Sequence, residues 1–301
     1  NTALGIGALD ALTTADYNVA IGYNTGTAIT TGSSNILIGS NAGDALVGGA
    51  SNIAIGSQAL STEDGNGRNI AIGHSALENQ NAGADAYNIA IGYTAGISIS
   101  TGTHNVLLGG LAGDALTTGS ANIAIGYEAL STEDGHSQNV AIGYQALKML
   151  DAGTAGLNVA VGHQAGTAMT TGQQNTLVGG LAGDALTSGH YNVALGYGAL
   201  STEDAHGRNV AVGYKALNVQ DAGANAYNVA MGYKAGFAIT SGTANTLIGA
   251  ETGDALTTGA GNVAIGYRAL SAENTGGRNV AIGYDALKVL DNDSQYTFNN
   301  F

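Results

Sequence analysis

The sequence predicts an all-β chain, a parallel β-roll or β-solenoid of about seventeen coils with a 17- or 19-residue repeat. Three observations predict this fold. A short string, Asn-Val-Ala-Ile-Gly at residues 18–22, recurs along the 301 residues. Thirteen copies alternate large and small side chains, and every copy closes with a glycine. A fixed period of this kind is typical of stacked supersecondary units, each of which covers the apolar face of its neighbour.

The asparagine that opens each copy sets the period of the chain. It stands at 1, 18, 35, 52, 69, 88, 105, 122, 139, 158, 175, 192, 209, 228, 245, 262 and 279. Three spacings of 17 and one of 19 make up a longer repeat, which opens at Asn18, Asn88, Asn158 and Asn228. The chain is therefore predicted to contain a 70-residue superrepeat of four coils.

The three residues after each asparagine predict a short β-strand. The first is Val, Ile or Thr, the second is Ala or Leu, and the third is Ile, Leu, Val or Met. This alternation has the period of two that a strand requires, whereas the recurrent glycine would break a helix. We expect Val19 and Ile21 to fill the coil and Ala20 to lie on the opposite face.

The asparagine and the glycine are predicted to be structural residues. Asparagine tolerates turn conformations, and stacked amides can form hydrogen bonds from coil to coil. The glycine marks a backbone site that needs a positive φ or lies too close to a neighbour for a Cβ atom. Representative positions are Asn18, Asn52, Asn122, Asn192 and Asn262, and Gly22, Gly56, Gly126, Gly196 and Gly266.

A second apolar position follows in two styles. Leu60 and Leu77 lie eight residues after their asparagine, whereas Ile29 and Leu46 lie eleven residues after theirs, with glycine in the earlier place. Both styles are expected to fill one volume. Turn-forming residues then close each coil. The repeat is predicted to cover 1–290, and 291–301 to begin a cap, stalk or following domain.

Composition excludes several classes of function. The net charge is −14 and the chain holds only eight Lys and Arg residues, which disfavours contacts with nucleic acid phosphates. No apolar run reaches eighteen residues, so membrane insertion is not expected. The absence of cysteine excludes disulfides and thiolate metal sites.

The repeated string resembles the repeats of known fibrous proteins. Asn-x-Ala-Ile-Gly-Tyr-x-Ala-Leu at 122–130 and 139–147 is similar to repeats of phage tail fibres and to the head β-roll of YadA-like trimeric autotransporter adhesins. The resemblance covers residues 1 to about 290. It implies a homotrimer at the surface of a virion or cell that takes part in attachment to a host. The 17- and 19-residue spacing departs from the usual adhesin head.

The alanine column is expected to face either solvent or another chain, and we favour a strip on which another chain packs. If Val and Ile fill the coil, the small side chains between them permit a close approach of a second backbone. Leucine replaces alanine in this column once per superrepeat. The predicted trimer strip comprises Ala20, Leu37, Ala54, Ala71, Leu107, Leu177 and Leu247.

No catalytic or metal-binding residue is predicted. An active site needs one asymmetric group of different side chains, whereas the polar residues of this chain recur from repeat to repeat. Nine copies carry Tyr after the glycine, which predicts an aromatic ladder, with Tyr127, Tyr197 and Tyr267 as the candidate glycan surface. Recurrent acids such as Glu63 and Asp64 are interpreted as a solvated face, with calcium left open as the one cofactor. The histidines outside the Tyr column are interpreted as surface residues.

These observations predict a non-enzymatic, extracellular structural segment of a phage tail fibre or similar surface appendage. Its predicted partners are two further copies of itself and a host receptor or glycan. Two alternatives stay open: a bacterial adhesin head that binds glycan or matrix, and a subunit of a self-assembling extracellular filament.

Overall fold

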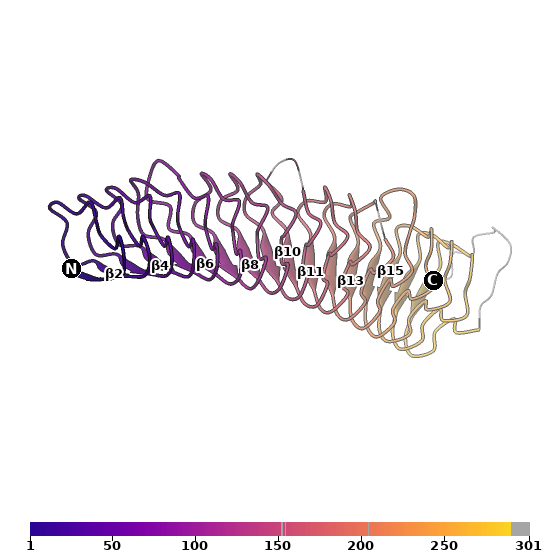
Figure 1. Cartoon of the computed structure of the whole chain (residues 1–301). Coiled ribbons are helices and arrows are strands. Elements are labelled where there is room, and N and C mark those ends of the chain that lie inside the picture. The colour runs from indigo at the N-terminus through magenta and orange to yellow at the C-terminus, as the bar shows by residue number, and fades with distance from the viewer. Residues whose placement is uncertain (152, 154, 204, 290–301) are drawn as a thin grey trace. The chain divides into compact units, whose positions relative to one another are not determined.

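The computed structural model shows a parallel β-solenoid (Figure 1). It describes residues 1–151, 153, 155–203 and 205–289. The chain divides into two compact units, Asn1–Gly156 and Leu157–Phe301, which we call unit 1 and unit 2. Throughout the described ranges the regular elements are short strands, and none of these residues forms a helix. The predicted all-β parallel solenoid is therefore confirmed.

Unit 1 holds nine strands of three residues, each of which follows one of the repeated asparagines. Every strand pairs in parallel and in register with the next one along the chain. The strands are β1 (Thr2–Leu4), β2 (Val19–Ile21), β3 (Ile36–Ile38), β4 (Ile53–Ile55), β5 (Ile70–Ile72), β6 (Ile89–Ile91), β7 (Val106–Leu108), β8 (Ile123–Ile125) and β9 (Val140–Ile142).

Unit 2 repeats this arrangement with eight strands. Their pairing is again parallel, in register and consecutive. The strands are β10 (Val159–Val161), β11 (Thr176–Val178), β12 (Val193–Leu195), β13 (Val210–Val212), β14 (Val229–Met231), β15 (Thr246–Ile248), β16 (Val263–Ile265) and β17 (Val280–Ile282).

The predicted assignment of the strand faces is wrong. The central residue of each strand from β2 to β17 is buried in the coil, and Ala20, Leu37 and Ala54 have no exposed surface within a single chain. The first and third residues point outward and are half-buried or exposed. The predicted trimer strip is therefore part of the core, as the 0% exposure of its seven members shows: Ala20, Leu37, Ala54, Ala71, Leu107, Leu177 and Leu247.

The two styles of apolar packing explain where leucine replaces alanine. A Cβ atom added to Gly26 would lie 2.8 Å from a methyl group of Leu37, and one added to Gly43 would lie 2.9 Å from the other methyl group. Leu37 thus fills the space that glycine leaves in its own coil and in the preceding coil. Ile29 and Leu46, both fully buried, occupy the rest of that volume. The expectation that the two styles fill one interior agrees with this packing.

The end of the predicted repeat lies partly outside the described residues. The last described strand is β17, and the turn after it is described to residue 289. The predicted transition at 291–301 falls on residues that the structure does not describe. Among the described residues no helix has the length and apolar character needed to cross a membrane.

Candidate functional site

The repeated asparagines form a buried hydrogen-bonded ladder in each unit. The Oδ1 atom of Asn18 accepts the backbone N–H of Asn35 at 2.9 Å, and Asn18 donates its own amide to the carbonyl of Gly32 at 2.8 Å. Asn52, Asn122, Asn192 and Asn262 repeat both contacts. Each side chain therefore joins its own coil to the next and satisfies backbone groups that are buried at the turn. This role is structural.

The glycine that follows each strand is required for two reasons at once. Gly126 has a φ of +133°, and a Cβ atom there would lie 2.4 Å from the carbonyl oxygen of Gly143 in the next coil. Gly22, Gly56, Gly196 and Gly266 have the same positive φ and the same close backbone neighbour. The left-handed conformation and the stacking distance both exclude a side chain.

The tyrosines after these glycines form exposed stacks on the surface of each unit. In unit 1, Tyr127 stacks on Tyr144 with ring centroids 5.8 Å apart. In unit 2, Tyr197, Tyr214 and Tyr233 form a continuous stack with spacings of 5.8 and 5.4 Å. These distances are those of favourable aromatic pairs.

The stacks remain open to solvent at their edges. Tyr197 keeps 51% of its surface exposed, and Tyr267 keeps 37% exposed while its ring packs against Tyr284 at 5.3 Å. Arg268 lies over the ring of Tyr267 at 5.0 Å. The ring faces are therefore partly occupied by neighbours, and the phenol edges form the accessible surface.

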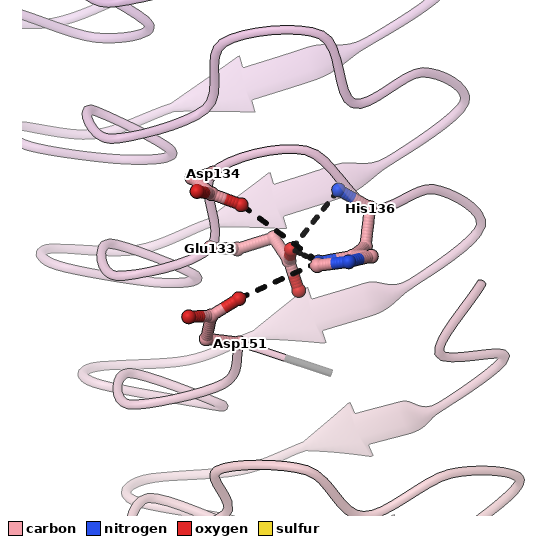
Figure 2. A group of neighbouring side chains, drawn as sticks. All are labelled: Glu133, Asp134, His136 and Asp151. Carbon is pink, nitrogen blue, oxygen red and sulfur yellow. Dashed lines mark hydrogen bonds and ion pairs between the residues drawn. The ribbon is translucent and has the colours of Figure 1, made fainter. Parts of the chain in front are cut away.

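A cluster of four titratable side chains lies at the turns that follow β8 and β9 in unit 1. Figure 2 shows the carboxylates of Asp134 and Asp151 directed toward the imidazole of His136, which also meets the carboxylate of Glu133. One ligand atom from each of the four residues lies within 4.8 Å of each of the others. The His136 Nδ1 atom is 4.0 Å from an oxygen of Asp134 and 3.6 Å from an oxygen of Asp151.

Glu133 is the buried member of this cluster. It has no exposed surface, and its Oε1 atom accepts the backbone N–H of His136 at 3.0 Å and also contacts His136 Nδ1. Its Oε2 atom is buried without a hydrogen-bond partner. Burial raises the pKa of the Glu133 carboxyl, while the hydrogen bonds and charge of His136 oppose that rise.

The stacking of coils explains how residues distant in sequence meet here. Asp134 lies twelve residues after Asn122, and Asp151 lies twelve residues after Asn139, so the two aspartates occupy the same place in successive coils. The amide of Asn122 donates to the carbonyl of His136 at 2.8 Å and holds the turn that carries the imidazole. The asparagine ladder therefore positions the cluster.

The same arrangement recurs one superrepeat later, in unit 2. Glu203, His206 and Asp221 also bring one ligand atom each within 4.8 Å of one another. No metal-binding residue was predicted, and His136 and His206 were interpreted as surface residues. The signal that identifies them is the superrepeat itself, which places a histidine three residues after a glutamate in two consecutive copies.

The comparisons with known proteins add no relative to this description. No family model, no curated protein and no solved structure matches the chain.

Proposed function

We propose that the chain is a non-enzymatic structural segment of a surface fibre, assembled as a homotrimer. The fibre is that of a phage tail or of a comparable extracellular appendage on a virion or cell, and it mediates or presents attachment to a host. The proposal rests on the resemblance of the repeats and on one structural observation, the apolar surface that the strands direct outward.

This surface consists of the first and third residues of each strand, and we call it the outer strip. In unit 1 the outer strip runs over β2 to β9 and includes Ile36, which is 41% exposed. In unit 2 it runs over β10 to β17 and includes Met231, also 41% exposed. A row of apolar side chains that stay partly exposed on consecutive strands, interrupted only by Thr176 and Thr246 in unit 2, is typical of a surface that packs against another chain.

The flanks of the outer strip also fit a protein interface. The tyrosine column begins two residues after the third strand residue, as Tyr127 follows Ile125, and aromatic residues are enriched at interfaces. No strand residue of either outer strip is charged. The occupant that we propose is a second and a third copy of this chain. The resemblance of the repeats implies three copies, and three outer strips that meet on one three-fold axis cover one another.

The mass of the purified full chain in solution tests this assembly. Light scattering after size-exclusion chromatography is expected to give three times the 29.7 kDa of one chain. Lysine at two adjacent outer-strip positions, Ile123→Lys with Ile125→Lys, is expected to give a folded monomer. Thr118→Lys with Thr132→Lys adds the same two charges at exposed turn positions, one in the preceding coil and one in the same coil, and is the matched control.

A monodisperse monomer of the unaltered chain would overturn the homotrimer. Filaments in negative stain that persist in the purified chain would instead favour the self-assembling filament. Far-UV circular dichroism of each variant separates loss of assembly from loss of fold.

A second function, glycan binding by an adhesin head, is favoured by the tyrosine stacks. Continuous, half-exposed rings such as Tyr197 and Tyr214 offer apolar edges and hydroxyl groups to a sugar. Binding to a glycan array that disappears with Tyr127→Ala, Tyr197→Ala and Tyr267→Ala would support this function. Binding that survives all three substitutions would place recognition elsewhere.

A further inference from the structure

We propose that Glu133, Asp134, His136 and Asp151 bind one divalent transition-metal ion of the zinc class, which joins two consecutive coils of unit 1. The equivalent residues Glu203, His206 and Asp221 are proposed to bind a second ion in unit 2. This inference concerns a metal site and does not depend on the proposed fibre function.

The geometry of the cluster fits a single ion. Zinc binds histidine nitrogen and carboxylate oxygen at about 2.0–2.2 Å and prefers four ligands in a tetrahedron, so the ligand atoms around it lie roughly 3–4 Å apart. His136 Nδ1 already lies 3.6 Å from an oxygen of Asp151 and 4.0 Å from an oxygen of Asp134. Both aspartates are more than half exposed, so a small rotation of either side chain brings its oxygen to the ion. His136 Nδ1 and Glu133 Oε1, which are in direct contact, separate to admit the ion between them.

The charge of the cluster calls for a cation. Three carboxylates converge here, and no lysine or arginine among the described residues forms an ion pair with Glu133, Asp134 or Asp151. Glu133 is fully buried, and its Oε2 atom has no hydrogen-bond donor. A buried carboxylate oxygen without a donor is costly, whereas a coordinated one is satisfied by the ion.

The chemistry of the ligands selects the class of metal. Calcium and magnesium take oxygen ligands almost exclusively. An imidazole nitrogen combined with carboxylates suits zinc and its first-row neighbours instead. His136 is only 15% exposed and its Nδ1 atom faces the carboxylates, so the nitrogen lies inside the ligand set. The proposed zinc-class site therefore differs from the calcium site that the sequence analysis left open for the recurrent acidic residues.

The first superrepeat supplies an internal comparison within unit 1. Glu63 has the same burial, and its Oε1 atom accepts the N–H of Asn66 at 3.0 Å, as that of Glu133 accepts the N–H of His136. The backbone at the two turns therefore has the same hydrogen bond. Asn66 and Asn81 stand where the second superrepeat has His136 and Asp151. The first superrepeat accordingly lacks the imidazole and one carboxylate of the proposed site.

The proposed test measures metal stoichiometry on the full chain. After treatment with a chelator, the chain is titrated with Zn²⁺ by isothermal calorimetry and with Co²⁺ by visible absorption, where intense d–d bands report four-coordinate ligation. Two ions are expected per chain. The double substitution His136→Asn with Asp151→Asn is expected to leave one, and the further pair His206→Asn with Asp221→Asn is expected to leave none.

A gain of binding provides the complementary variant. Asn66→His with Asn81→Asp gives the first superrepeat the missing ligands and is expected to raise the stoichiometry to three. The loss variants import asparagines that the first superrepeat already accommodates, so they are expected to fold. His104→Asn removes an exposed histidine of unit 1 that stacks on Tyr87 and should leave two ions bound.

Three results would overturn the metal site. The first is a stoichiometry that His136→Asn with Asp151→Asn does not change. The second is an equal loss on His104→Asn. The third is displacement of bound Co²⁺ by millimolar Ca²⁺, which would contradict ligation by nitrogen. An increase in the thermal unfolding midpoint with Zn²⁺, absent from the variant that binds none, would support the proposed link between coils.

Discussion

At the residue scale, the fold depends on a few positions whose chemistry is fixed by the neighbouring coil. The asparagine satisfies buried backbone groups of two coils, and the glycine after each strand lies against the next backbone. Once per superrepeat a fully buried glutamate occupies the position where the preceding coil has a leucine, as Glu63 follows Leu46. These residues differ in kind: the first two build the coil, and the third introduces a titratable group into it.

The glycine column predicts a large and local loss of stability. Gly126→Ala places a Cβ atom 2.4 Å from a backbone oxygen at a φ of +133°. We expect it to lower the free energy of unfolding of unit 1 by at least ~2 kcal/mol, the order of a strained backbone residue. Guanidinium denaturation followed by circular dichroism measures this loss. Gly65→Ala is the control, because no atom lies within 4 Å of its added Cβ. Equal midpoints for the two variants would contradict the role of stacking.

Burial of Glu63 predicts a pH dependence of stability. Burial raises the pKa of its carboxyl above the ordinary value of 4.5, with the backbone N–H of Asn66 opposing the rise. The folded state therefore holds its proton to a higher pH than the unfolded chain does. The contribution of the protonated Glu63 carboxyl to the free energy of unfolding is fully present below the pKa of the unfolded state. This contribution is lost as the pH rises through the pKa of the folded state.

Glu63→Gln removes this titration and keeps an oxygen that can accept the N–H of Asn66. We expect the variant to gain about 1 kcal/mol over the unaltered chain at pH 7 and to lose that gain near pH 4. Chemical denaturation at a series of pH values measures the difference. Asp10→Asn, which removes an exposed carboxyl of unit 1, is the control for the loss of one negative charge. A gain for Glu63→Gln that is equal at all pH values would rule out the titration.

At the element scale, sequence alone predicted the strands but not their faces. Each three-residue strand carries apolar side chains on both of its faces, large on one face and small on the other. Hydrophobicity alone therefore does not show which face points into the coil. The larger Val19 and Ile21 were expected inside, whereas the narrow coil accepts the smaller Ala20. The decisive signal was that leucine enters the central position only in coils with glycine eight residues after the asparagine, once for every two consecutive coils of that kind. Side chains that share a volume compensate in this way.

The acidic cluster was missed for a related reason. In the sequence the members of the cluster lie in two separate turns. Only the stacking of coils brings Asp134 close to Asp151. The regular spacing of the asparagines was sufficient to align these positions. The sequence carried one sign that Glu133 points into the coil, because it stands eleven residues after Asn122, where the preceding coil has Leu116 eleven residues after Asn105.

Exchanging leucine and alanine in the central strand position is expected to destabilise the fold in two ways, by a cavity in one variant and by overpacking in the other. Leu37→Ala empties the space beside Gly26 and Gly43, and we expect it to cost roughly 2–5 kcal/mol, as for other buried leucines. Ala54→Leu inserts the same side chain into a coil where Leu60 already fills that space, and overpacking is expected to cost about 1–3 kcal/mol. Denaturant unfolding measures both. A neutral Leu37→Ala would contradict the shared volume.

At the scale of the whole molecule, the net charge of −14 opposes the assembly that the outer strips favour. A fibre of three chains carries three times this charge. In the proposed trimer the attraction between copies is apolar, because the strand residues of the outer strips are uncharged, and the repulsion comes from the remaining surface. These two contributions respond differently to salt, which makes the proposed trimer testable without any substitution.

We expect added NaCl to strengthen the trimer. The Debye length falls from about 30 Å at 0.01 M to about 8 Å at 0.15 M, so the repulsion between chains is screened while apolar burial is retained. The dissociation constant, measured by analytical ultracentrifugation over a dilution series, should fall by roughly tenfold or more across this range. Ile123→Lys with Ile125→Lys should remain monomeric throughout. Dissociation promoted by salt would show that ion pairs hold the copies together, and would contradict packing through the outer strips.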